Sequence, residues 1–283
     1  KSHGNVVAVV TIAKEKAGAY ADYADLSGLA AAHDIPLHRV GDINHQDNVE
    51  LVRSLRPDVI FVFGWSRLVS RQILDVPPLG CIGSHPTLLP ANRGRHPIVW
   101  ALAKGLQESG LTFFHLEESP DSGDILWQRA FSISLEDDAK SVYEKIESLA
   151  GEAIQELLPQ LERRSAPRVP QDDSRATYWR KRTQKDGEID WSASSMTVYN
   201  LVRALTRPYV GAHTFVAGEK MKVWRAKLPS GPPAVDRDGL PSGTVLSTSE
   251  EGFVVRTGDS YVTVDWGKME RDARIRAGAI LGR

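Results

Sequence analysis

The 283-residue sequence has a single cysteine, no long apolar run and almost no net charge. One cysteine, Cys81, excludes an intramolecular disulfide and a thiolate metal cluster. Because it lies in an apolar stretch, we interpret it as a small buried hydrophobe. No run approaches the roughly 18 apolar residues of a membrane span, and no signal-peptide pattern is visible. The net charge of −1 gives no electrostatic reason for bulk nucleic-acid binding.

Signature motifs of metal and nucleotide enzymes are also missing. The sequence has no His-Glu-x-x-His pair, no calcium loop, no Walker loop and no Gly-x-Gly-x-x-Gly. We therefore predict no metal ligands, and a redox or ATP-dependent enzyme is poorly supported. One local basic cluster is interpreted as a solvated face, with contact to an anionic substrate as the alternative. Its members are Arg175, Arg180, Lys181, Arg182 and Lys185.

What the sequence does contain is an alternation of strand and helix patterns over its first 160 or so residues. Strand-like runs lie at 5–11, 36–40, 59–65, 80–85, 111–116 and 125–133, and helix-like runs at 21–33, 47–55, 68–74, 97–105 and 140–161. This alternation predicts an α/β fold, with a mostly parallel twisted sheet and flanking helices. We expect Asn44 or Asp47 to cap the helix at 47–55.

The pattern changes after about residue 163. A polar segment with two prolines follows, then a short helix at 198–205, and then strands separated by turn residues. The strands are expected at 221–225, 243–247, 252–256 and 261–265. We therefore predict an N-terminal α/β domain over 1–163, a connector over 164–191, and a small β-rich, barrel-like domain over 192–283.

Two polar loops follow strand ends, and each delivers a group suited to proton transfer. His85 ends the apolar run at 80–85 and precedes Pro86, while Asp121 lies in the turn-forming segment 118–124. Strand ends of an open sheet usually build its active site. A carboxylate beside an imidazole fixes its tautomer and stabilises the imidazolium. We therefore predict that His85 and Asp121 form a catalytic pair, with Asp124 as the alternative carboxylate.

The loop after His85 continues with basic residues. Arg93, Arg95 and His96 stand just before the helix expected from Pro97. Anions bind well at a helix N-terminus, and guanidinium groups suit phosphate. We interpret these three residues as substrate-binding. For the two arginines, structural pairing with a carboxylate is the alternative.

At these residues the chain resembles the folate-dependent formyltransferase family. That family builds its site from an Asn-x-His strand end, a Leu-Leu-Pro-x-x-Arg-Gly loop and an Asp-x-Gly loop. The corresponding residues here are 83–85, 88–94 and 121–123. Segments at 183–191 and 200–212 resemble the family's inter-domain crossing and the start of its C-terminal β domain. The resemblance extends over roughly residues 55–265.

The resemblance implies an enzyme that transfers a formyl group from N10-formyltetrahydrofolate to a primary amine. Glycinamide-ribonucleotide formyltransferases lack a C-terminal domain of this kind, whereas methionyl-tRNA and nucleotide-sugar formyltransferases have one. Because the segment 93–97 looks closer to the sugar enzymes, we predict a nucleotide-linked amino sugar, or a related nonulosonic-acid precursor, as acceptor. Three alternatives remain open: methionyl-tRNA formylation, a catalytically silent folate-fold binding module, and a formyltetrahydrofolate hydrolase.

The resemblance also implies a folate site. Its expected contacts are Phe63, Gly64, Trp65, Ser66, Leu68, Ser122 and Gly123. One departure stands out, because Gly83 occupies the position of the family's Asn, an amide that helps to hold the formyl oxygen as negative charge develops. The replacement donor stays open between Asn92, a backbone N–H and a water. Asn92 is therefore our third catalytic candidate.

The family's first strand is not found before Val6, and the sequence starts without Met. This predicts that it is the remainder of a longer chain. We expect a cytoplasmic protein with no membrane partner, and we do not favour a nucleic-acid partner. The long apolar helix and the β-rich domain offer surfaces for a homodimer, which we leave open.

Overall fold

The computed structural model describes residues 4–18, 23–65, 67–231, 239–266, 272 and 274–282. The chain divides into two compact units. Unit 1 comprises Lys1–Pro97, Ser109–Phe131 and Lys145–Trp179, and unit 2 comprises Ile98–Glu108, Ser132–Glu144 and Arg180–Arg283. No helix within the described part of the chain is long and apolar enough to cross a membrane.

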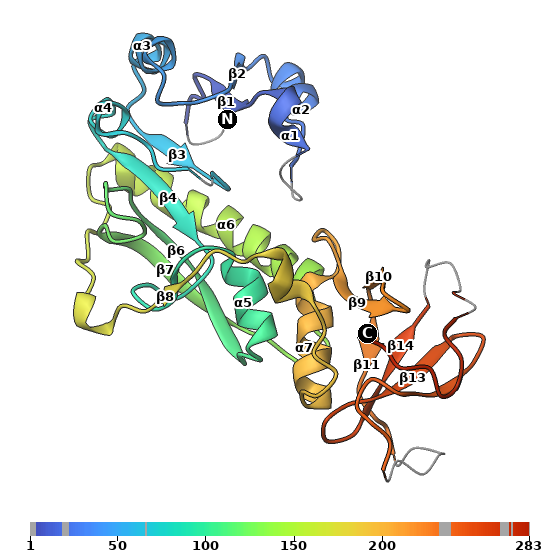
Figure 1. Cartoon of the computed structure of the whole chain (residues 1–283). Coiled ribbons are helices and arrows are strands. Elements are labelled where there is room, and N and C mark those ends of the chain that lie inside the picture. The colour runs from blue at the N-terminus through green and yellow to red at the C-terminus, as the bar shows by residue number, and fades with distance from the viewer. Residues whose placement is uncertain are drawn as a thin grey trace. The chain divides into compact units, whose positions relative to one another are not determined.

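Strands are interspersed with helices up to residue 180 (Figure 1). The elements are β1 (Val9–Ile12), α1 (Lys14–Ala17), α2 (Ser27–Ala32), β2 (Leu37–Val40), α3 (Gln46–Leu55), β3 (Ile60–Val62), α4 (Arg71–Leu74), β4 (Cys81–His85), β5 (Arg93–Gly94), α5 (Pro97–Ala103), β6 (Glu108–His115), β7 (Ile125–Ser132), α6 (Ala139–Glu162), the 3-10 turn η1 (Asp173–Arg175) and β8 (Tyr178–Trp179). Although β6 and β7 follow one another without a helix between them, the α/β class is confirmed.

The central sheet of unit 1 has the strand order β3-β4-β6-β7, and β1 pairs with β2 in a separate parallel sheet. β3 and β4 run parallel, whereas β4 and β6 run antiparallel. The sheet is thus mixed, although local apolar patterns favoured a mostly parallel arrangement. The direction of a strand depends on how the chain returns to the sheet, and the composition of the strand itself does not record it.

Side chains of β3 and β4 alternate between two apolar cores, because successive residues of a strand point to opposite faces. Phe61 and Ile82 pack with residues of α6 on one face. Ile60 and Cys81 pack with residues of α3 and α4 on the other. α6 runs along its own face of the sheet (Figure 1) and buries side chains four residues apart, the spacing of one helical face.

Burial of Cys81 has a chemical consequence. It raises the pKa of the thiol to about 12, so the reactive thiolate is scarce near neutral pH. We expect iodoacetamide at pH 8 to leave the folded protein unlabelled and to label it once urea unfolds it. The measurement is the mass of the intact protein against time. Labelling of the folded protein at the rate of the unfolded one would contradict this placement.

The start of α3 corrects the capping prediction. Its N-cap residue is His45, and no side chain caps the helix. Asn44 is engaged elsewhere, since its amide nitrogen donates to the Leu68 carbonyl (2.9 Å) and its oxygen accepts from the Ser70 N–H (2.8 Å). These two bonds hold the segment that leads into α4. That helix spans only Arg71–Leu74 and is shorter than the helical pattern at 68–74.

Unit 2 carries the β-rich part of the chain. After η2 (Gln184–Gly187) come α7 (Ser195–Leu205), β9 (Ala212–Val216), β10 (Glu219–Val223), β11 (Ala226–Lys227), β12 (Val245–Thr248), β13 (Gly252–Arg256) and β14 (Tyr261–Asp265). The order β11-β14-β13-β12 forms an antiparallel sheet, and β9 pairs with β10. The β-rich prediction is confirmed, but these strands form two separate sheets and no closed barrel among the described residues.

The turn between β9 and β10 shows how local sequence sets this hairpin. Ala217 and Gly218 form a two-residue loop, and both have positive φ (50° and 81°). Two-residue loops of this type match the right-handed twist of the strands that they join. Glycine adopts positive φ readily, which suits Gly218 to the second position of the loop.

Candidate active site

His85 and Asp121 lie together in unit 1, as predicted from the sequence. His85 is the last residue of β4 and is 5% exposed, and Asp121 lies in the loop between β6 and β7. β6 runs antiparallel to β4, so its last residue, His115, lies opposite Ile82 near the start of β4. The loop that follows must therefore turn back along the sheet to bring Asp121 to His85. The His85 Nδ1 atom is 3.8 Å from the Asp121 Oδ2 atom. At this distance the two groups form an ion pair when the imidazole is protonated.

The contact of the other His85 ring nitrogen, Nε2, shows which nitrogen carries a hydrogen. Nε2 is 2.9 Å from the backbone carbonyl oxygen of Asn92. A carbonyl oxygen can only accept, so Nε2 carries a hydrogen and donates it. Nδ1 is then the nitrogen that faces Asp121. The ring therefore has an oxygen atom in front of each nitrogen, an arrangement suited to the doubly protonated imidazolium.

The Asp121 carboxylate is held from the loop that follows β4. Its Oδ2 atom accepts a hydrogen bond from the Gly94 N–H at 2.8 Å. Gly94 belongs to β5, which pairs in parallel with β8. A Cβ atom at Gly94 would lie 2.2 Å from the Trp179 carbonyl oxygen, and the φ of Gly94 is +109°. Only glycine suits this position, so the pairing of β5 with β8 depends on it.

The position of Arg93 corrects one sequence prediction. Its side chain is 2% exposed and donates to the Gln171 amide oxygen, the Tyr178 hydroxyl and the Asp173 carboxylate. The guanidinium group is thus occupied within the chain and turned away from solvent. It holds unit 1 together through these partners and does not offer the predicted contact to a substrate.

Gln171 connects Arg93 to the loop that carries Asp121. Its amide oxygen accepts from the Arg93 guanidinium, and its amide nitrogen donates to the Asp121 carbonyl (2.9 Å) and the Gly123 carbonyl (2.7 Å). Sequence reasoning missed this residue, because it lies in the segment interpreted as a connector. Only the pairing of β5 with β8 brings that segment to the site, and no periodicity in the sequence marks it.

The structure also shows where the other candidates on the loop after β4 lie. Asn92 reaches His85 through its backbone carbonyl, whereas its side-chain oxygen accepts from the Thr177 hydroxyl at 3.2 Å. Arg95 and His96 are exposed just before α5. The Arg95 backbone N–H donates to the carbonyl of the second β8 residue at 3.0 Å. Asn92, Arg95 and His96 therefore follow the β4 strand end on one loop.

The loop of Asp121 contains the two other residues that were assigned to folate. The Ser122 hydroxyl donates to the Ser119 carbonyl at 3.0 Å. A Cβ atom at Gly123 would lie 2.0 Å from the His115 carbonyl oxygen, so this position admits glycine alone. The alternative carboxylate, Asp124, pairs with Arg168 at 3.2 Å.

The predicted folate loop after β3 is only partly apolar. Phe63 is 50% exposed, and its ring contacts the rings of Phe61 and Phe113, with centroids 5.7 and 5.6 Å apart. Leu68 is exposed as well. Ser66 lies outside the described residues.

Trp65 in this loop carries an unsatisfied donor. Its ring packs against the core cluster that contains Cys81. Its Nε1 atom is buried without a hydrogen-bond partner among the described residues, and so is the Ser70 hydroxyl at the start of α4. Buried polar atoms are nearly always bonded, so two orphans within one loop call for an explanation. A bound molecule with polar edges would supply partners for them.

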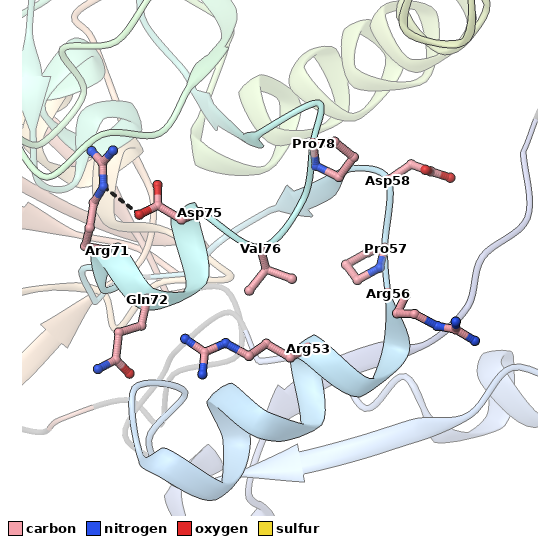
Figure 2. A pocket seen from close by; sticks show the side chains of 9 residues that line it. All are labelled: Arg53, Arg56, Pro57, Asp58, Arg71, Gln72, Asp75, Val76 and Pro78. Atoms are coloured by element: carbon pink, nitrogen blue, oxygen red, sulfur yellow. Dashed lines mark hydrogen bonds and ion pairs between the residues drawn. The ribbon is translucent and has the colours of Figure 1, made fainter.

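An open hollow in unit 1 lies elsewhere (Figure 2). It is at the opposite end of the parallel strands from His85, between α3, α4 and the residues that precede β3 and β4. Its lining residues are Arg53, Arg56, Pro57, Asp58, Arg71, Gln72, Asp75, Val76 and Pro78. Figure 2 shows Arg71 paired with Asp75, at 2.9 Å. The candidate site is therefore defined by its converging side chains and not by this hollow.

Two protein-family models match the chain. Residues 1–158 match the model described as formyl transferase, which covers more than half of the chain. The chain belongs to the formyl transferase family. Residues 181–282 of this formyltransferase match the model described as formyl transferase, C-terminal domain. The segment 159–180, which carries Gln171 and β8, lies between the two matches.

Solved structures show the same fold. HypX from Aquifex aeolicus, in complex with tetrahydrofolic acid, is 21% identical with a TM-score of 0.68, and the match covers 92% of this chain and 44% of that chain. This formyltransferase thus spans less than half the length of HypX. An N-formyltransferase from Helicobacter canadensis, in complex with folinic acid and dTDP-3-aminofucose, is 14% identical with a TM-score of 0.61, covering 87% of this chain and 85% of that chain.

A third similar structure is methionyl-tRNA formyltransferase from Clostridium thermocellum. It is 19% identical, with a TM-score of 0.57, and the match covers 79% of this chain and 93% of that chain. At these identities the likeness concerns the fold alone. The acceptor of this formyltransferase must therefore be argued from its own residues.

Proposed function

We propose that this formyltransferase moves a formyl group from N10-formyltetrahydrofolate to the primary amine of a nucleotide-linked amino sugar or a related nonulosonic-acid precursor. The observation that carries the proposal is the pairing of His85 with Asp121 at the end of β4, 3.8 Å apart, in a chain of the formyl transferase family. The sugar acceptor is supported by the fold shared with the Helicobacter canadensis enzyme and by the exposed Arg95 and His96.

The residues present fit the folate donor. The donor supplies a formyl carbon bound to nitrogen, which an amine can attack. The loop 63–68 would hold its ring system, because the buried Nε1 atom of Trp65 needs an acceptor and the Phe63 ring is half exposed. Contacts from Ser122 and Gly123 remain part of this proposal.

His85 and Asp121 divide the proton chemistry. Nε2 of His85 is engaged with the Asn92 carbonyl, so we assign the role toward substrate to Nδ1. Protonated there, the imidazolium stabilises the oxygen that becomes negative as nitrogen attacks. Asp121 keeps the ring in place and accepts the proton that the attacking amine loses. That proton then returns, through the same pair, to the folate nitrogen that departs.

We also propose the layout predicted from the sequence, with the chemistry in residues 1–163, a connector over 164–191 and a β-rich domain over 192–283. The two family matches, which end at residue 158 and begin at residue 181, support such a division. A cytoplasmic location is part of the same proposal.

Methionyl-tRNA is the second candidate acceptor. Arg180, Lys181 and Lys185 are exposed, and a basic surface of this kind attracts a phosphate backbone. The net charge of −1 argues against a tRNA acceptor, because nucleic-acid binders usually carry a marked positive charge. We therefore place the sugar first.

The experiment that tests the proposal is a panel of acceptors. The protein is incubated with N10-formyltetrahydrofolate and UDP-, dTDP- or GDP-linked amino sugars, or with initiator tRNA charged with methionine, and products are weighed by mass spectrometry. Gain of one formyl group on a sugar supports the proposal. Formylation of the tRNA alone supports the second candidate. Binding of folate without any product indicates a silent binding module, and release of tetrahydrofolate without a formylated acceptor indicates a hydrolase.

Replacing Gln171 by alanine should lower kcat about tenfold with little change in KM for the donor. The substitution removes the two hydrogen bonds that hold the Asp121 loop, and a small displacement of a catalytic group is costly. Initial rates at several donor concentrations separate the two constants. Gln155→Ala on the exposed face of α6 is the matched control. Equal kcat in the Gln171 and Gln155 variants would refute a positioning role for Gln171.

A further inference from the structure

The face of β4 that carries His85 has a gap in its row of side chains. Cys81, Gly83 and His85 alternate with Ile82 and Ser84, so the first three share one face. Gly83 is buried and contributes no side chain there. A donor placed at residue 83 would stand directly beside the imidazole.

Two side chains from the neighbouring strand end cover this gap. The residue opposite Gly83 is Phe114, and Leu116 follows two residues later. A Cβ atom built on Gly83 would lie 2.5 Å from Leu116 Cδ2, 3.3 Å from its Cγ and 3.4 Å from Phe114 Cζ. The wall beside Gly83 is therefore apolar.

Glycine at this position is explained by the position of the Leu116 side chain and not by backbone conformation. The φ angle of Gly83 lies outside the left-handed region, so any L-residue could adopt it. Glycine within a strand weakens the strand and often marks a close approach of other atoms. Here the approaching atoms belong to the end of the Leu116 side chain.

Leu116 is fixed by its backbone but not by its side chain. Its N–H donates to the Cys81 carbonyl at 2.8 Å, which holds its main chain against β4. Its side chain is half-buried and lines an open hollow that Gly80 and His115 also line. Space on that side allows the leucine end to swing away, or a smaller residue to replace it.

We propose that the Leu116 side chain occupies the place in which a polar side chain from residue 83 would hold the formyl oxygen, and that this pair of residues limits the rate of transfer. The inference rests on the proposed function. With Gly83 and Leu116 as they are, His85 is the one side chain of this face of β4 that can stabilise the developing oxyanion. One hydrogen-bond donor aimed at an oxyanion typically changes kcat by about 10²–10³-fold.

A matched pair of double variants tests the proposal. Gly83→Asn with Leu116→Ala introduces an amide and clears its space, whereas Gly83→Ala with Leu116→Ala clears the same space without a donor. The readout is tetrahydrofolate release from N10-formyltetrahydrofolate, measured with dTDP-3-aminofucose and with water alone. Attack by either nucleophile develops negative charge on the same oxygen. We expect the asparagine variant to have at least about tenfold higher kcat than the alanine variant, with similar KM for the donor. Equal kcat in the two variants would overturn the proposal.

A thermal unfolding cycle tests the packing independently of activity. Gly83→Ala should lower the unfolding temperature by several degrees when Leu116 is present, because the added methyl group collides with it. In the Leu116→Ala background the same change should have little effect. Equal shifts in both backgrounds would show that the two residues are not coupled. If the wild type and every variant release no tetrahydrofolate, the proposed function fails, and so does the proposed effect of Gly83 and Leu116 on the transfer rate. The unfolding cycle still decides whether Leu116 fills the gap at Gly83.

Discussion

Replacing His85 by alanine should lower kcat for formyl transfer by about 10³-fold, in the middle of the range for a single acid–base group. The substitution removes the only imidazole beside Asp121 in the described part of the site. It also removes the donor that we assign to the oxyanion. The measurement is the initial rate of tetrahydrofolate release in the presence of an amino-sugar acceptor. Asp121→Asn should cost about 10²-fold, because asparagine can still accept from the Gly94 N–H but cannot take a proton.

Two controls separate chemistry from folding in this experiment. His85→Gln keeps a side-chain N–H that can donate to the Asn92 carbonyl, but it provides no imidazolium. We expect it to fold like the wild type and to be as slow as the alanine variant. His45→Ala changes an exposed histidine at the start of α3 and should leave the rate unchanged. Wild-type rates in both His85 variants would refute the assignment of this residue.

Replacing Arg93 by leucine should lower the free energy of unfolding by about 3 kcal/mol, since hydrogen bonds to charged groups are each worth roughly 1.5–3 kcal/mol. The guanidinium group is 2% exposed and donates to three side chains, so a leucine leaves the Gln171 oxygen and the Tyr178 hydroxyl without their donor. Urea unfolding followed by tryptophan fluorescence measures the change.

Asp173→Asn provides the comparison for Arg93. The Asp173 carboxylate is 79% exposed although it accepts from the same guanidinium, and exposed ion pairs contribute at most about 1 kcal/mol. We therefore expect a destabilisation of less than about 1 kcal/mol in this variant. If Arg93→Leu were no more destabilising than Asp173→Asn, the hydrogen bonds of the buried guanidinium group would not stabilise the fold as we expect.

His85 and Asp121 could be named as candidates from the sequence because the signals that mark each of them are local. His85 ends an apolar strand and Asp121 lies in a turn-forming loop, and both signals can be seen in short stretches of sequence. Their meeting depends on the path of the loop after β6, because antiparallel β6 ends opposite Ile82 and not beside His85. Helices and strands followed the apolar patterns because those patterns are local as well. The hairpin at 217–218 needed only its turn residues.

Features that depend on distant segments could not be predicted in this way. Asn44 has the chemistry of a helix cap, but it bonds to residues 68 and 70, and nothing near it in the sequence indicates those partners. Arg93 resembles an anion-binding residue until its partners at 171–178 are known. The antiparallel direction of β6 likewise depends on the path of the chain.

The pairing of β5 with β8 also decides how short an active fragment of this protein can be. A polypeptide cut at residue 158, where the first family match ends, would retain His85 and Asp121 yet lose Gln171, Thr177 and the strand Tyr178–Trp179. The side chain of Arg93 would then be exposed to water, and the loop of Asp121 would lose its hydrogen bonds from Gln171. Truncation and domain-exchange experiments on this enzyme should accordingly place the cut beyond Trp179.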